Sequence, residues 1–238
     1  MSLAYRRSGG EFVVNVTEIG YATPSMTTLS SGQFVATWTA YNEGASEIRA
    51  RLFTAEGAPV GDEFLIGWSV SFGASDVTAL DTGGFAVTWR EVDSHGFGIK
   101  GRVFLADGSP AGDVFDVNTQ EMGNQTQPTI TALNSGGLAI TWMDQEIEGG
   151  AFNIRAQLFS PAGRKVGSEI LVDTSPLGTD QSRPELTTLS SGDFVIAWHE
   201  DGGDNAVEGI RGQRFSASGT RKGAEFQINT QMANDQFD

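Results

Sequence analysis

The phrase LSSGQFVATW at residues 29–38 returns three times along the chain, as LDTGGFAVTW at 80–89, LNSGGLAITW at 133–142 and LSSGDFVIAW at 189–198. Each copy ends on a tryptophan, and the gaps between successive tryptophans are 51, 53 and 56 residues. A repeat of about 50 residues is typical of a propeller or of another modular array. The phrase therefore indicates the architecture before any single residue is considered.

Each phrase predicts a turn followed by a strand. A glycine at its fourth position supplies the positive φ angle that a tight turn needs; these are Gly32, Gly83, Gly136 and Gly192. The closing segments FVATW, FAVTW, LAITW and FVIAW are apolar at neighbouring positions instead of alternate ones. This pattern predicts a strand that is buried on both faces. We therefore assign a packing role to the repeat tryptophans, Trp38, Trp89, Trp142 and Trp198.

Three further strands are expected in every repeat. A short Thr-rich segment precedes the phrase (SMTTL, DVTAL, TITAL, ELTTL), and two segments follow it (IRARLF and EFLI in the first copy). No segment combines helical periodicity with helix caps. We predict an all-β, β-propeller-like fold with four repeats of a four-stranded antiparallel blade, the Thr-rich strand innermost. A linear β-repeat array is the alternative.

The predicted domain is a single repeat domain at residues 11–238, with repeats at approximately 23–67, 75–118, 127–173 and 183–229. The phrase of the fourth strand also occurs before the first repeat, so an extra outer strand is expected at 11–16. Two interpretations follow: four blades close a ring that the spare strand seals, or the chain is cut from a longer array.

Composition excludes several classes of partner. The formal net charge is −15, which opposes binding to nucleic acid and to anionic lipid surfaces. The chain has no apolar run long enough for membrane insertion, and it contains no cysteine, so disulfides and thiolate sites are absent. An acidic chain without cysteine and rich in glycine and threonine fits a secreted bacterial protein, and we expect an extracellular location. A cytoplasmic protein of the same composition is the alternative.

A basic residue follows the isoleucine of every third strand: Arg49, Lys100, Arg155 and Arg211. In three repeats a carboxylate stands two residues after the tryptophan, namely Glu91, Asp144 and Glu200, whereas the first repeat has Ala40. Acid and base meet if the two strands pair as a hairpin. We interpret them as repeated structural ion pairs, the alternative being a ring of charge around a ligand.

The loops between the second and third strands are acidic and vary in length. The densest is EDGGDNAVE, in which Glu200, Asp201, Asp204 and Glu208 are candidate ligands for Ca²⁺. Their spacing matches neither the EF-hand loop nor the calcium-binding glycine-aspartate nonapeptide. A solvated acidic hairpin tip is the alternative.

No catalytic residue is assigned. His95 and His199 lie in different repeats and belong to no recognisable catalytic motif. Aromatic side chains near the variable connections are candidate ligand-binding residues, because such rings can serve as platforms for sugars. They are Tyr41, Trp68, Phe97 and Phe152.

The full pattern is P-x-x-T-x-L-x-x-G-x-F-V-x-x-W, followed by I-R-x-R-x-F-x-x-x-G-x-x-x-G-x-E-F-x-V-N-T-Q. It resembles the repeats of about 50 residues in large secreted bacterial proteins, described as type I secretion targets, hemolysin-type calcium-binding or adhesin-like proteins. The resemblance covers residues 11–236. It implies a secreted location and a structural or adhesive role, and it assigns no catalytic residue and no calcium ligand.

Three functional hypotheses result. The first is a non-enzymatic module of a secreted bacterial protein that binds a glycan or a cell-surface ligand through its variable loops. The second is a carbohydrate-active hydrolase on a propeller scaffold, which two carboxylates facing across a central pocket would favour. The third is a structural spacer.

Overall fold

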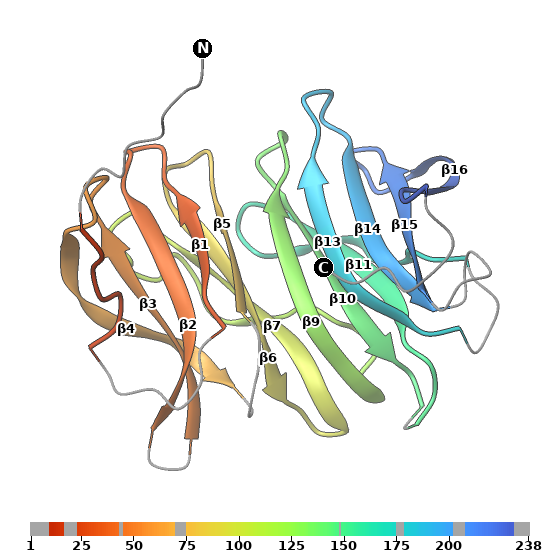
Figure 1. Ribbon diagram of the computed structural model, residues 1–238, viewed down its shortest axis with the longest axis horizontal. Coiled ribbons are helices and arrows are strands. Elements are labelled where there is room, and N and C mark those ends of the chain that lie inside the picture. Colours follow the sequence, from red (N-terminus) through yellow and green to blue (C-terminus); the bar gives the residue numbers. More distant parts are fainter. Residues whose placement is uncertain are drawn as a thin grey trace.

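The computed structural model describes residues 10–16, 23–42, 45–69, 75–147, 149–174, 179–201 and 208–230. These residues form β-strands, turns and loops without a helix (Figure 1). No helix long and apolar enough to cross a membrane occurs within these ranges.

The strands form four antiparallel blades in chain order. Blade 1 contains β1 (Ser25–Thr28), β2 (Phe34–Asn42), β3 (Ala45–Phe53) and β4 (Pro59–Ser69). Blade 2 contains β5 (Ser75–Ala79), β6 (Phe85–Val92), β7 (Gly96–Phe104) and β8 (Phe115–Asp116). Blade 3 contains β9 (Gly123–Ala132), β10 (Leu138–Gln145), β11 (Asn153–Phe159) and β12 (Lys165–Leu171). Blade 4 contains β13 (Gln181–Thr188), β14 (Phe194–Asp201), β15 (Glu208–Phe215) and β16 (Arg221–Gln227).

Each strand pairs with the next one along the chain within its blade. One additional pairing joins blades 2 and 3, because β7 runs parallel to β9 over Gly96↔Gly123 and Phe97↔Asn124. Blades 1 and 4 stand at opposite ends of the row in Figure 1. The prediction of an all-β fold built from four-stranded antiparallel blades is confirmed.

The glycine turns form as the repeated phrase predicts. The φ angles of Gly32, Gly83, Gly136 and Gly192 are 84°, 90°, 83° and 86°. In the first turn the amide of Gly32 donates to the carbonyl of Leu29, and the amide of Leu29 donates to the carbonyl of Gln33. The buried strand begins directly after this turn, at Phe34.

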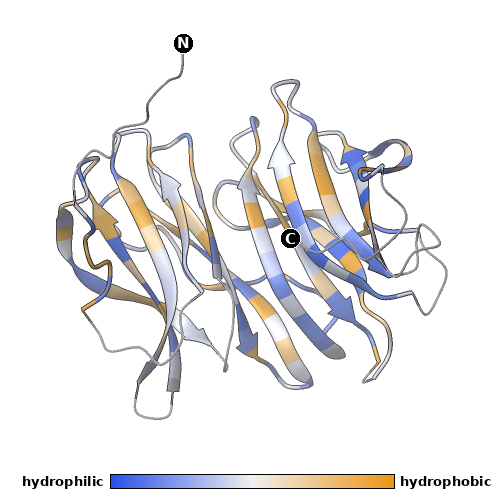
Figure 2. Cartoon of the chain, in the orientation of Figure 1, coloured by the Kyte–Doolittle hydropathy of each residue, from blue (hydrophilic) through white to orange (hydrophobic). Residues whose placement is uncertain are grey.

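The repeat tryptophans are buried, with Trp38 2%, Trp89 0%, Trp142 0% and Trp198 1% exposed. Trp38 lies in an apolar cluster of blade 1 against which Val14 packs, whereas the other three lie between blades. Trp89 of blade 2 lies in one apolar cluster with Ile48 and Ile66 of blade 1. Trp142 and Trp198 occupy matching clusters between blades 2 and 3 and between blades 3 and 4. Many of the hydrophobic segments lie along the strands, whereas much of β16 is hydrophilic (Figure 2).

Residues 10–16 have no assigned strand, although an outer strand was expected at 11–16. Their contacts still match those of a fourth strand. The ring of Phe12 lies against the position of Gly57, as Phe64 of β4 lies against Gly108 in the next blade. Phe12 also packs on Phe53, with ring centroids 5.6 Å apart. The segment therefore covers the outer part of blade 1.

The cross-hairpin ion pairs form in two blades. Arg155 donates through Nε to Asp144 at 2.6 Å, and Arg211 donates through Nε to Glu200 at 2.6 Å. Both carboxylates are almost fully buried, so these pairs help to hold the second strand to the third.

The expected pair does not form in blade 2, where Lys100 binds Asp116 of β8 instead. The carboxylate of Glu91 accepts a hydrogen bond from Nε1 of Trp89 at 3.2 Å. In blade 1, which lacks the acid, Arg49 pairs with Glu47 of its own strand at 2.7 Å.

Candidate functional site

The innermost strands of all four blades line one pocket of about 830 Å³. This volume lies within the range of small-molecule sites. The wall contains the first residues of β1 and β5, the middle of β9 and β13, and Arg90 of β6. Four positions are equivalent in the repeat and pair with equivalent residues of the second strand: Ser25, Asp76, Thr129 and Glu185. Two blades therefore present a carboxylate where the other two present a hydroxyl.

Asp76 is held by three hydrogen bonds from three blades. Its Oδ1 accepts from the hydroxyl of Ser25 at 2.7 Å and from the amide of Val77 at 2.9 Å. Its Oδ2 accepts from the amide of Ile130 at 2.9 Å. Donors at both oxygens fix the orientation of this carboxylate.

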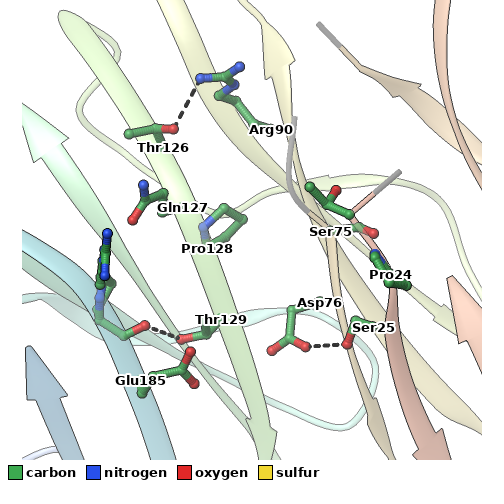
Figure 3. A pocket seen from close by; sticks show the side chains of 13 residues that line it. Pro24, Ser25, Ser75, Asp76, Arg90, Thr126, Gln127, Pro128, Thr129 and Glu185 are labelled. Carbon is green, nitrogen blue, oxygen red and sulfur yellow. Dashed lines mark hydrogen bonds between the residues drawn. The ribbon is translucent and has the colours of Figure 1, made fainter. Parts of the chain in front are cut away.

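Glu185 faces the same pocket from blade 4. Partial desolvation by the pocket walls raises the pKa of Glu185, and the negative charge of Asp76 raises that pKa further. The residue nevertheless stays exposed, so a ligand can reach it. Figure 3 shows Asp76 and Glu185 on either side of Thr129. The two carboxyl groups thus have different environments, because Asp76 accepts three hydrogen bonds and Glu185 is partly desolvated.

Two β-bulges shape the wall above these carboxylates. The pairing of β9 with β10 shifts between Thr141 and Met143, and that of β13 with β14 shifts between Ser182 and Glu185. In these bulges Gln127 and Arg183 have φ angles of 49° and 51°. Such left-handed angles cost side-chain-bearing residues about 1–3 kcal/mol each and often mark functional sites.

Arg90 closes the side of the pocket between blades 2 and 3. Its guanidinium lies 4.7 Å from the centre of the Phe97 ring and donates to the hydroxyl of Thr126 at 3.1 Å. Burial lowers the pKa of Arg90. These contacts fix a cation at the pocket wall.

None of the four predicted ligand-binding aromatic residues lines this pocket. Tyr41 and Trp68 are 50% and 51% exposed on blade 1. Phe97 is partly buried under Arg90, and Phe152 packs against the apolar cluster between blades 3 and 4. The structure does not bring these four side chains together into one site.

The predicted calcium ligands do not form a visible cation site. Glu200 is buried and forms an ion pair with Arg211, whereas Asp201 is exposed. Asp204 and the side chain of Glu208 lie outside the described residues. Within the described part of the chain, no group of three or more His, Asp or Glu side chains is arranged to hold a metal ion.

Sequence reasoning missed Asp76 and Glu185. Both begin segments that were used only as strand starts, DVTAL and ELTTL. The signal in the sequence was this repeat position, which holds an acid in two repeats and a hydroxyl residue in the other two. The pocket is lined mainly by residues of the innermost strands, whereas the predicted ligand residues lie in or near the variable loops.

Comparison with known proteins gives similarity at the level of structure alone. No protein-family model matches the chain, and no curated protein matches its sequence. An α-L-arabinanase from Penicillium chrysogenum, solved with arabinobiose, is 13% identical, with 87% of this chain and 66% of that chain covered and a TM-score of 0.61. An α-L-arabinofuranosidase from Fusarium graminearum, in complex with an iminosugar inhibitor, is 12% identical with the same coverage and a TM-score of 0.58.

An endo-arabinase from Bacteroides thetaiotaomicron is 12% identical over 93% of this chain and 85% of its own, with a TM-score of 0.52. This chain thus spans about two thirds of the length of the two fungal enzymes. These findings contradict our prediction of a non-enzymatic adhesive module, because the similar structures are named as an arabinofuranosidase, an endo-arabinase and an arabinanase. They favour the hydrolase alternative. The resemblance to secretion repeats and the extracellular location stay predictions, whereas the shared β-propeller fold is shown.

Proposed function

We propose that the protein is a carbohydrate-active hydrolase that cleaves glycosidic bonds in the central pocket. The observation that carries the proposal is the pair Asp76 and Glu185, two carboxylates from different blades that face one pocket and interact electrostatically. Glycoside hydrolysis commonly needs two carboxyl groups with distinct roles. The structural similarity to an α-L-arabinofuranosidase and an α-L-arabinanase supports the same reaction class.

The environments of the two groups suggest their roles. Glu185, with its raised pKa, is the general acid that protonates the leaving glycosidic oxygen. Asp76, held by Ser25, Val77 and Ile130, is the ionised partner. It either accepts a proton from the attacking water or attacks the anomeric carbon itself, and the stereochemistry of the product distinguishes these routes.

The direct test is sugar release by the purified chain from arabinan, arabino-oligosaccharides and xylan. Release that disappears in Asp76→Asn, while the melting temperature stays near that of wild type, supports the proposal. The melting temperature is essential because the new amide nitrogen must replace an oxygen that accepts hydrogen bonds. The proposal would be wrong if the wild-type protein hydrolysed no glycoside in this panel or in a broader one.

The pH dependence follows from the raised pKa of Glu185. The folded protein holds this proton more tightly than the unfolded chain, so the contribution of Glu185 to stability decreases as pH rises from the ordinary glutamate pKa through the raised one. kcat falls over the same upper range because the acid is lost. We expect carbon-13 NMR to show a lower titration midpoint for Glu185 in Asp76→Asn than in wild type. An unchanged midpoint would contradict coupling between the two carboxyl groups.

A further inference from the structure

The bulges of blades 3 and 4 place two polar side chains at the mouth of the central pocket. Gln127 and Arg183 both precede a proline, both are exposed, and both adopt left-handed backbone angles. Residues before proline normally favour extended angles. The surrounding sheet therefore holds two equivalent positions in an unfavourable conformation, and both side chains belong to the pocket wall.

The charge of the pocket differs from that of the molecule. The chain has 15 Lys and Arg against 30 Asp and Glu. The pocket wall contains two cations, Arg90 and Arg183, and two carboxyl groups, Asp76 and Glu185. When Glu185 carries its proton as a general acid, the lining residues have a net positive charge. An anionic group on a ligand complements such a site.

Arg90 is prepared to bind such a group. The Phe97 ring and the Thr126 hydroxyl fix its guanidinium, which removes part of the entropy cost of binding. Guanidinium groups bind carboxylates in planar, often bidentate geometry, and burial strengthens the interaction. Arg183 brings a second guanidinium from the bulge of blade 4, and Gln127 of the bulge in blade 3 contributes an amide that suits sugar hydroxyls.

We propose that the central pocket selects a sugar ring that bears a carboxylate, a hexuronate, with Arg90 and Arg183 binding the carboxylate. This inference rests on the proposed hydrolase function and specifies its substrate class. Arg183 is the specificity residue, because it is exposed at the mouth and lies in the blade that carries Glu185.

The test measures binding by calorimetry on the full chain, with glucuronic acid against glucose and galacturonic acid against galactose. Each pair differs at the carbon that carries the carboxylate. We expect at least one uronate to bind about tenfold more tightly than its neutral counterpart, a preference that added salt weakens. Arg183→Gln should abolish this preference. Arg164→Gln, which changes an exposed arginine in the β11–β12 turn away from the pocket, should keep it.

The outcomes separate this inference from the hydrolase proposal. Uronate preference without hydrolysis of any glycoside supports the carboxylate site and removes the hydrolase. Hydrolysis of neutral glycosides with no uronate preference overturns the inference and leaves the hydrolase standing. A preference that survives both Arg183→Gln and Arg90→Gln also overturns it, because the carboxylate would then bind elsewhere.

Discussion

Replacing Glu185 by glutamine should lower kcat on the best glycoside substrate by about 10²–10⁴-fold, the usual contribution of a general acid. Glutamine keeps the size of the side chain and removes the proton that the leaving oxygen needs. KM should change little, since the group acts mainly in the transition state. On glycosides with an activated leaving group, such as 4-nitrophenol, kcat should decrease much less, because that leaving group departs without protonation.

The matched control is Glu56→Gln, which changes an exposed glutamate in the β3–β4 turn, away from the central pocket. Steady-state kinetics should show no effect of this change. An equal loss on activated and ordinary glycosides would argue against a proton-donating role for Glu185. Full activity of Glu185→Gln would exclude Glu185 from the chemistry altogether.

Replacing Trp142 by alanine should lower the free energy of unfolding by about 3–5 kcal/mol. This side chain is 0% exposed and belongs to the apolar cluster between blades 2 and 3. Its removal leaves a cavity that two packed sheets cannot easily close. For a domain of this size the loss corresponds to a melting temperature lower by roughly 6–20 °C.

Two further variants isolate the cause of that loss. Trp68→Ala removes the same ring from a position that is 51% exposed, so a loss below about 1 kcal/mol is expected. Trp142→Phe should lower the free energy of unfolding far less than Trp142→Ala does. Phenylalanine keeps most of the ring, and Nε1 of Trp142 has no hydrogen-bond partner to lose among the described residues. Equal losses from Trp142→Ala and Trp68→Ala in denaturant titrations would refute burial as the origin of the effect.

The fold was predictable because its determinants are local and occur four times. The apolar strand behind each glycine turn identifies a sheet that is covered on both faces, and four copies identify four blades. Gly32 and Trp38 illustrate this, since each has its expected conformation or burial.

The site was not predictable to the same degree, because it forms only where the four innermost strands converge. Asp76 and Glu185 are 109 residues apart in sequence and meet through the packing of blades. In the sequence, the only sign of the bulges at Gln127 and Arg183 is the proline that follows each of them. This sign is not sufficient, because Thr23 also precedes a proline and has no positive φ angle. Aromatic residues such as Trp68 were more conspicuous in the sequence, but they do not line the pocket.

Asp76 has a second consequence beyond the reaction. The donors that fix its two oxygens belong to blades 1, 2 and 3, so the same carboxylate ties together the inner edges of neighbouring sheets. A slide of either seam removes one of these donors, Ser25 on one side or Ile130 on the other, while the amide of Val77 still holds the carboxylate. The orientation of this carboxylate is therefore sensitive to any movement between neighbouring blades, because two of its three donors lie across a seam.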